Sequence, residues 1–225
     1  MDFLDWVRGP LLAASLAVFL LGTAWRLWVV YRLPRALAAG AARQPFGRSA
    51  ALRAALGRFA VPRGFAPSAT LVTLNPYAFH IGLAVVVFGY APHIAFIRRL
   101  TGLSWPALPD GVMYAAAGLT IVSLLVALMF RLADPVLRRI SRADDFFTWT
   151  VTMLPLLTGM AVITDPSAAL AARDHVVYRT PLALHLLSME LLLVWFPFGK
   201  LMHAFLAIPG RMQLATFFGR RGVRT

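Results

Sequence analysis

Long stretches of apolar residues alternate along this chain with shorter segments that are rich in arginine. A helix needs about 20 apolar residues to cross a hydrocarbon core of about 30 Å, because each residue advances the helix by about 1.5 Å. Stretches of this kind occur near residues 9–30, 76–97, 111–130, 146–164 and 181–208. The pattern predicts an all-α fold, in which residues 1–225 form one integral membrane bundle of five helices.

The overall composition agrees with a membrane protein. Hydrophobic residues make up 60% of the chain and charged residues 14%, with a mean hydropathy of +0.72, which lies outside the usual range of soluble domains. The net charge of +13 would suggest a nucleic-acid partner in a soluble protein. Here the arginines lie mainly between the predicted spans, where membrane topology explains them, and we expect no nucleic-acid partner.

The basic residues are distributed very unequally between the two sides of the predicted bundle. The larger group has sixteen members and the smaller has five: Arg32, Arg35, Arg43, Arg48, Arg53, Arg58, Arg63, Arg131, Arg138, Arg139, Arg142, Lys200, Arg211, Arg220, Arg221 and Arg224, against Arg8, Arg98, Arg99, Arg173 and Arg179. Because positive loops remain in the cytoplasm, we expect the N-terminus in the periplasm and the C-terminus in the cytoplasm of a bacterial inner membrane. The acidic start of the chain lacks the basic region of a cleaved signal peptide, so we expect the first span to be retained.

A short amphipathic helix is predicted near residues 49–60, between the first two spans. Leu52, Leu56 and Phe59 recur at helical spacing, and Arg53 and Arg58 lie off that line. We interpret it as a helix on the inner membrane surface, with its basic residues on anionic headgroups. The alternative is a docking surface for a cytoplasmic partner.

The chain contains no cysteine, which excludes several kinds of redox site. Without thiolates it cannot hold a cysteine-ligated iron–sulfur cluster, a covalently attached c-type haem or a disulfide. A redox group held by this chain would have to be bound non-covalently through nitrogen ligands.

Histidine is the residue type that offers such ligands, and four of the five histidines lie in predicted spans. His185 and His203 are 18 residues apart, which is five helical turns, so on one straight helix both leave the same face about 27 Å apart. His80 and His93 lie in the second span, which runs in the opposite direction. His80 can therefore face His203, and His93 can face His185, at two levels of the bundle.

Paired imidazoles suit haem better than other metal centres. A zinc or similar site would need three or four ligands, commonly with cysteine or carboxylate, whereas two axial imidazoles complete a six-coordinate haem. The alternative for a membrane histidine is a hydrogen bond between helices. The direction of His93 is open, because it lies 13 residues and about 220° from His80 and follows Pro92, which can kink the helix.

Two motifs around these histidines resemble a known family. The first motif is Phe79-His80-Ile81-Gly82, and the second is Leu184-His185-Leu186 followed by Phe196-Pro197-Phe198-Gly199-Lys200-Leu201-Met202-His203. Together they resemble the haem b (gamma) subunit of respiratory nitrate reductase. Relatives of that subunit occur in membrane complexes associated with sulfite and heterodisulfide reductases. The resemblance extends loosely over nearly all of the chain, including five spans with the N-terminus outside.

The resemblance implies haem ligands at particular positions. It implies that His80 and His203 hold an inner haem b and that His185 is one ligand of an outer haem. The nitrate reductase pattern has its other outer histidine ten residues after the first, where this chain has Tyr90, and His93 lies one turn onward. The chain is expected either to bind two haems, with His93 as the substitute, or to bind one haem through His80 and His203 alone.

Three further positions carry candidate chemistry. Arg98 and Arg99 follow His93 and are expected either to pair with haem carboxylates or to anchor the helix at the interface. Glu190 lies deep in the fifth predicted span, where it would either accept protons from a quinol or form a hydrogen bond between helices. His175, in the preceding loop, is expected to be exposed to solvent.

The resemblance implies an electron-transfer function. The expected protein is a cytochrome b subunit that passes electrons between membrane quinones and an iron–sulfur subunit, with its catalytic subunit, on the cytoplasmic side. A haem-free membrane anchor or transporter subunit, whose histidines pair helices or relay protons, is the alternative of a different class. A haem-handling or haem-sensing protein is the third possibility.

Overall fold

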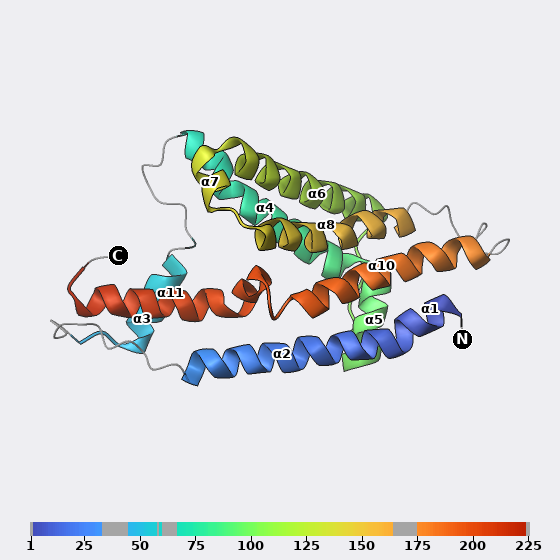
Figure 1. Ribbon diagram of the computed structural model, residues 1–225, viewed down its shortest axis with the longest axis horizontal. Coiled ribbons are helices and arrows are strands. Elements are labelled where there is room, and N and C mark those ends of the chain that lie inside the picture. Colours follow the sequence, from blue (N-terminus) through green and yellow to red (C-terminus); the bar gives the residue numbers. More distant parts are fainter. Residues whose placement is uncertain (1, 33–44, 58, 60–66, 164–174, 224–225) are drawn as a thin grey trace.

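The computed structural model describes residues 2–32, 45–57, 59, 67–163 and 175–223 of the chain, without the side chains of residues 67–69, 163 and 175–179. Within these ranges the chain is helical and contains no strand (Figure 1). The elements in order are α1 (Phe3–Trp6), η1 (Val7–Leu11), α2 (Leu12–Arg32), α3 (Arg48–Gly57), α4 (Pro67–Gly89), α5 (Ala91–Thr101), α6 (Asp110–Ala133), α7 (Pro135–Ile140), α8 (Ala143–Ile163), α10 (His175–Trp195), η2 (Lys200–Met202) and α11 (His203–Arg220).

Several of these helices have the length and composition of membrane spans. Four helices in the described part of the chain are long and apolar enough to cross a membrane: Phe3–Arg32, Thr70–Gly89, Asp110–Ala133 and Ala143–Val162. A bent pair of helices, Thr180–Trp195 with Lys200–Arg220, would make a fifth span if it is counted as one. The predicted all-α bundle is confirmed, and the number of candidate spans agrees with the five expected when the bent pair is included.

The second span is predicted at 76–97, and both of these ends differ from the helix ends in the structure. Helix α4 begins at Pro67 and ends at Gly89, and a separate helix, α5, begins at Ala91. Tyr90 between them has an extended backbone, and Pro92 lies in the first turn of α5, where a missing N–H is tolerated. The free carbonyl at the end of α4 is satisfied from elsewhere, because the Leu108 N–H donates to Gly89 O at 2.9 Å.

The fifth predicted span, 181–208, is not one straight helix. Helix α10 ends at Trp195, and the chain bends by 75° before Lys200–Arg220. Pro197 in the break is fully buried, and a Cβ added to Gly22 of α2 would lie 2.7 Å from the Pro197 Cγ, so the two backbones approach closely here. His185 and His203 therefore lie on different helices, and the expectation of one shared face is wrong.

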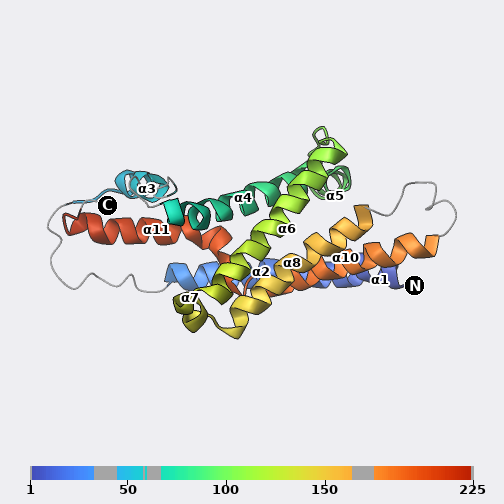
Figure 2. The ribbon, with the colours of Figure 1, turned by 90° about the horizontal axis from the view of Figure 1, so that it is seen from above.

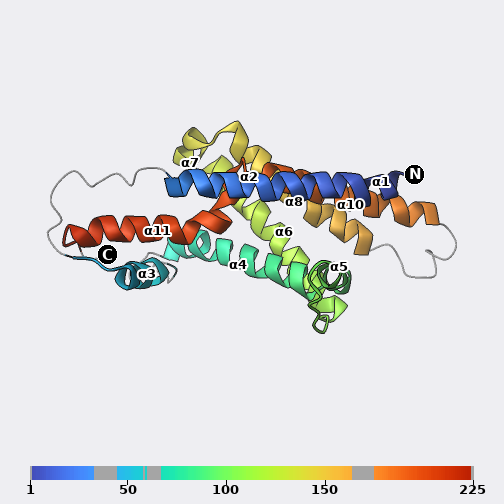
Figure 3. The same ribbon diagram turned by 90° about the horizontal axis from the view of Figure 1, so that it is seen from below.

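The long helices pack as neighbours with alternating direction, apart from α2 and α10. Helix α4 packs on α6, α6 on α8, and α8 on α10, while α2 lies along the other side of α10. Leu4 and Val7 cluster with Ala183, and Gly22 meets Pro197, so α2 and α10 run in the same direction. The three views show the resulting elongated bundle, with the N-terminus and α5 toward one end and α7 toward the other (Figures 1, 2 and 3).

Helices α3 and α11 pack on each other at the end of the molecule that holds α7, beyond the last residues of α2 (Figures 1 and 3). The predicted helix near 49–60 is confirmed as α3, and its expected place on the inner membrane surface stays a prediction. Ala51 and Ala55 are buried, whereas Leu52, Leu56 and Phe59 are 40%, 50% and 38% exposed. The small alanine side chains allow a close helix pair, which leaves the leucine row on the outside.

Candidate functional site

The structure brings the four span histidines together in the two predicted pairs. The rings of His80 and His203 have their centroids 5.9 Å apart with perpendicular planes. The rings of His93 and His185 have their centroids 6.2 Å apart and are nearly parallel, at 20°. Each pair joins the α4–α5 segment to the α10–α11 segment, as the sequence pattern predicts.

The Nδ1 atom of each of these rings already has a hydrogen-bond partner. His80 Nδ1 lies 2.6 Å from Pro76 O, His203 Nδ1 lies 2.9 Å from Lys200 O, and His93 Nδ1 lies 3.0 Å from Val86 O. A carbonyl oxygen only accepts, so Nδ1 carries the proton and Nε2 keeps its lone pair. This tautomer is the one that metal-bound histidines commonly adopt, with the second nitrogen held by an outer partner.

His185 is held in the same way by a hydroxyl group. Its Nδ1 lies 3.1 Å from Thr158 Oγ1, which also lies 2.8 Å from Leu154 O. A hydroxyl has one hydrogen to donate, so the tautomer of His185 depends on which of these neighbours the Thr158 hydroxyl faces. Ser188 Oγ lies 2.9 Å from Thr158 Oγ1 and donates to His185 O at 2.7 Å, so a small polar network fixes the ring.

The spacing of the rings suits two ligands on one metal ion. An imidazole nitrogen lies about 2 Å from a transition metal and about 1.1 Å from the centre of its own ring, so two ligands on opposite sides of one ion have centroids about 6 Å apart. The observed values, 5.9 and 6.2 Å, lie close to this figure. Among the described residues there is no group of three or more His, Cys, Asp and Glu side chains that could hold a metal ion, so the donors occur as pairs.

An ion-pair network holds the segment that carries His203. The Lys200 Nζ lies 2.5 Å from a carboxylate oxygen of Asp145, and Arg131 Nη1 lies 3.1 Å from the same atom. The Asp145 side chain is buried, and its second oxygen accepts from the Arg142 N–H. The network ties η2 to the end of α6 and the start of α8, three residues before His203.

The ring of His185 also packs closely on the backbone of α8. A Cβ added to Gly159 would lie 3.1 Å from His185 Cε1, so a larger residue there would push the ring. Neither Gly159 nor the Thr158 and Asp145 contacts were found by sequence reasoning. Ser188, three residues after His185 on the same helix, is a partner that local spacing could have suggested.

Tyr90, which stands where the nitrate reductase pattern has its histidine, lies beside His93. The two ring centroids are 5.2 Å apart, at an interplanar angle of 84°. The break in the helix at Tyr90 turns His93 toward His185, which resolves the direction that the sequence left open. Tyr90 does not take the place of His93 in the ring pair.

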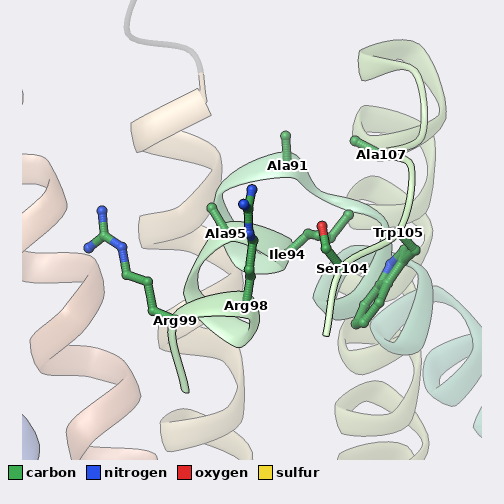
Figure 4. Close-up of a pocket in the computed structure, with 8 residues that line it drawn as sticks. All are labelled: Ala91, Ile94, Ala95, Arg98, Arg99, Ser104, Trp105 and Ala107. Atoms are coloured by element: carbon green, nitrogen blue, oxygen red, sulfur yellow. The ribbon is translucent and has the colours of Figure 1, made fainter. Parts of the chain in front are cut away.

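Arg98 and Arg99 lie near the end of α5 and line a pocket with the following loop (Figure 4). Among the described residues, neither guanidinium group contacts His93 or His185. Neither arginine forms an ion pair with a described residue. The expected contact with haem carboxylates therefore stays a prediction. His175 is the first residue of α10, and its side chain lies outside the described residues.

Glu190 is buried in α10, with 2% of the residue exposed. Neither of its carboxyl oxygens has a hydrogen-bond partner among the described residues. It lies two turns after Ala183, on the face of α10 that packs on α1 and η1. The expected hydrogen bond between helices is not seen, and the expected role with a quinol stays a prediction.

No protein-family model matches this chain. The chain is 32% identical over 229 residues to a curated protein of Nitratidesulfovibrio vulgaris (strain Hildenborough), whose name is given only as "Protein". The alignment covers 98% of this chain and 96% of that protein. Similarity at this level over nearly the full length of both proteins shows common ancestry. This chain therefore belongs to the family of that N. vulgaris protein.

Proposed function

We propose that this protein is a b-type cytochrome subunit of a bacterial inner membrane that transfers electrons between quinones and a cytoplasmic iron–sulfur partner. The observation that carries the proposal is the geometry of the two histidine pairs. In each pair the ring centroids lie about as far apart as those of two imidazoles that hold one metal ion, at 5.9 and 6.2 Å, and every Nδ1 has an outer partner.

The chain's residues fit two haem groups, one in each pair. His80 and His203 would hold one, and His93 and His185 would hold the other. A bound haem b supplies one-electron oxidation and reduction at its iron. His80, His93 and His203 would supply ligands of one tautomer, and the outer partners of Nδ1 would hold the rings in place and raise their basicity.

The chain's other contacts position these ligands. The Lys200–Asp145–Arg131 network anchors the segment before His203, and Thr158 with Ser188 anchors His185. His80 and His203 are exposed side chains on helices of membrane type. A polar ring that faces hydrocarbon is costly unless something compensates, and a bound cofactor would do so.

The quinone and the partners come from the resemblance to the nitrate reductase gamma subunit. The described chain has no cysteine for an iron–sulfur cluster, so the electron donor or acceptor on the cytoplasmic side would be another protein. Five arginines belong to helices at the α7 end of the bundle: Arg48, Arg53, Arg138, Arg139 and Arg220. This distribution supports a cytoplasmic location for that end and a site there for the iron–sulfur and catalytic subunits.

Haem content per polypeptide tests the proposal. The purified protein should contain two haems and show a sharp band on reduction in the visible spectrum. His80→Ala or His203→Ala should each remove one haem, and His93→Ala or His185→Ala the other. His175→Ala, which changes the remaining histidine, is the control and should keep both haems. Full haem content in His203→Ala would contradict the assignment.

One observation favours a different function. Glu190 is a buried carboxyl group without a hydrogen-bond partner among the described residues, in a helix that also carries a histidine. A haem-free membrane subunit that relays protons would use such groups. The visible spectrum of the purified protein separates the two functions. A haem-free subunit shows no visible band even when the cells that produce it are well supplied with haem.

A further inference from the structure

The pocket beside α5 is the feature that the proposed function leaves unexplained. It has a volume of about 480 Å³ and is lined by Ala91, Ile94, Ala95, Arg98, Arg99, Ser104, Trp105 and Ala107. One wall is α5 and the other is the loop that connects α5 to α6 (Figure 4). His93 does not line it, because the pocket lies on another face of α5.

The loop wall is held firmly to the end of α4. The Trp105 Nε1–H donates to Phe88 O at 2.6 Å, and the Leu108 N–H donates to Gly89 O at 2.9 Å. Gly102 ends α5 with a φ of 79°, in the left-handed region, and its N–H donates to Arg98 O. These bonds preorganise the pocket, because both walls are anchored to the same helix end.

The lining combines two positive charges with apolar surface. In Figure 4 the Arg98 side chain rises between Ala95 and Ser104, and Arg99 extends away from the other lining residues. No carboxylate lines the pocket, and neither arginine pairs with a described acidic residue. A guanidinium matches a phosphate with two parallel hydrogen bonds, and the Ser104 hydroxyl can add a third. The apolar residues would contact a hydrocarbon part of the same ligand.

The surroundings of the pocket are apolar and outward-facing. Leu103 and Leu108, next to lining residues in the loop, are 64% and 42% exposed. The pocket lies where the chain passes from one membrane-length helix, α4, to the next, α6. With α4 and α6 across a membrane, this position would be at the level of the lipid headgroups. Tryptophan is also enriched at this level, because its ring is apolar and its N–H is polar. A water-soluble anion would need none of these apolar neighbours.

We infer that this pocket binds the headgroup of an anionic phospholipid, with Arg98 on the phosphate and the start of the acyl chains against the apolar part of the lining. The site is independent of haem, and it assigns Arg98 to a lipid in place of a haem carboxylate. A net negative lipid is favoured over a zwitterionic one because no acidic side chain among the described residues pairs with either arginine.

Native mass spectrometry of the full-length protein tests this inference. Delipidated protein in detergent would be titrated with phosphatidylglycerol, with phosphatidylcholine and with glycerol 1-phosphate. We expect phosphatidylglycerol to bind about tenfold more tightly than phosphatidylcholine, and glycerol 1-phosphate not to displace it. Displacement of the lipid by equimolar glycerol 1-phosphate would overturn the lipid assignment in favour of a free phosphate.

Two variants locate the site. Arg98→Gln should lower the affinity for phosphatidylglycerol about tenfold, and Arg98→Gln with Arg99→Gln should remove the preference over phosphatidylcholine. Arg138→Gln is the matched control, because Arg138 also has an arginine neighbour and is also exposed, but lies on α7 at the opposite end without lining this pocket. An unchanged preference in the double variant, with unchanged helicity, would refute the site.

Discussion

At the scale of single residues, the site depends on which nitrogen of each imidazole is engaged. The outer partners at Nδ1 are backbone carbonyls for His80, His203 and His93, and the Thr158 hydroxyl for His185. The carbonyl of Pro76 lies four residues before His80, and that of Lys200 lies three residues before His203. A helical backbone brings such near neighbours in sequence into reach of the ring. Thr158 is 27 residues from His185 and comes from the neighbouring helix.

Glycine at position 82 is also required by a close contact. A Cβ there would lie 2.3 Å from Thr120 Oγ1 and 3.1 Å from the backbone oxygen of Ala116, so α4 and α6 could not keep their present separation. Gly82→Ala should lower the free energy of unfolding by about 2 kcal/mol, as overpacked sites do. Thermal unfolding in detergent, followed by far-UV circular dichroism, measures the change.

Gly118→Ala provides the control for that prediction. A Cβ at Gly118 meets nothing within 4 Å, and alanine favours a helix over glycine by up to about 1 kcal/mol. This variant should therefore unfold at the same temperature as the parent protein or at a higher one. Equal losses in the two variants would show that α4 and α6 are not packed as described.

At the scale of elements, two of the four paired histidines lie where helices break. His93 lies in the first turn of α5, just after the interruption at Tyr90, and His203 begins α11 after the break at 196–199. Pro92 and Pro197 mark both places in the sequence. A proline shows that a helix can be interrupted, but the new direction depends on contacts such as that between Pro197 and Gly22.

The break before His203 is held by an ion pair that can be tested. Asp145→Asn removes the negative charge that Lys200 and Arg131 share, at 2.5 and 3.1 Å, in a side chain that is 5% exposed. We expect a loss of about 2 kcal/mol in the free energy of unfolding, between the values for exposed and fully buried pairs. Chemical denaturation in detergent measures it.

Asp144→Asn is the matched control, because Asp144 is the neighbouring residue and lies 3.6 Å from Lys200 with a side chain that is 41% exposed. Its replacement should cost less than about 0.5 kcal/mol. If both variants lose the same stability, the buried network does not anchor the segment.

At the scale of the whole molecule, the unequal charge of the two ends predicts the orientation in the membrane. Helices α3, α7 and α11 lie at one end and carry arginines, whereas α5 lies toward the other end with the N-terminus (Figures 1 and 3). Because α2 and α10 run in the same direction, their first residues must lie on one side of the bundle. The positive-inside rule assigns that side to the periplasm.

Single cysteines can test this orientation cleanly, because the chain contains none. Asp110→Cys, at the exposed start of α6, should react with a membrane-impermeant maleimide in intact spheroplasts. Ser49→Cys, exposed on α3, should react only after permeabilisation. The parent protein, with no thiol, gives the background. Labelling of Ser49→Cys in intact spheroplasts would reverse the assignment.

Much of this architecture could be predicted from the sequence. The membrane-length helices and the pairs His80–His203 and His93–His185 followed from run length and helical spacing. The packing of α3 on α11 did not, because the hydrophobic pattern marks the row of Leu52 and Leu56, whereas the contact buries the small Ala51 and Ala55. Hydrophobic pattern alone does not show whether a helix will meet lipid or another helix.

The sequence by itself determined the helical class, the number of candidate spans and the residue type available as a ligand. These properties depend on local composition and on the fixed rise of a helix. Only the tertiary structure decided where the second and fifth spans break, which nitrogen of His185 is engaged and how the pocket at Arg98 closes. Those features depend on contacts between residues far apart in the chain, such as Gly22 with Pro197 and Thr158 with His185.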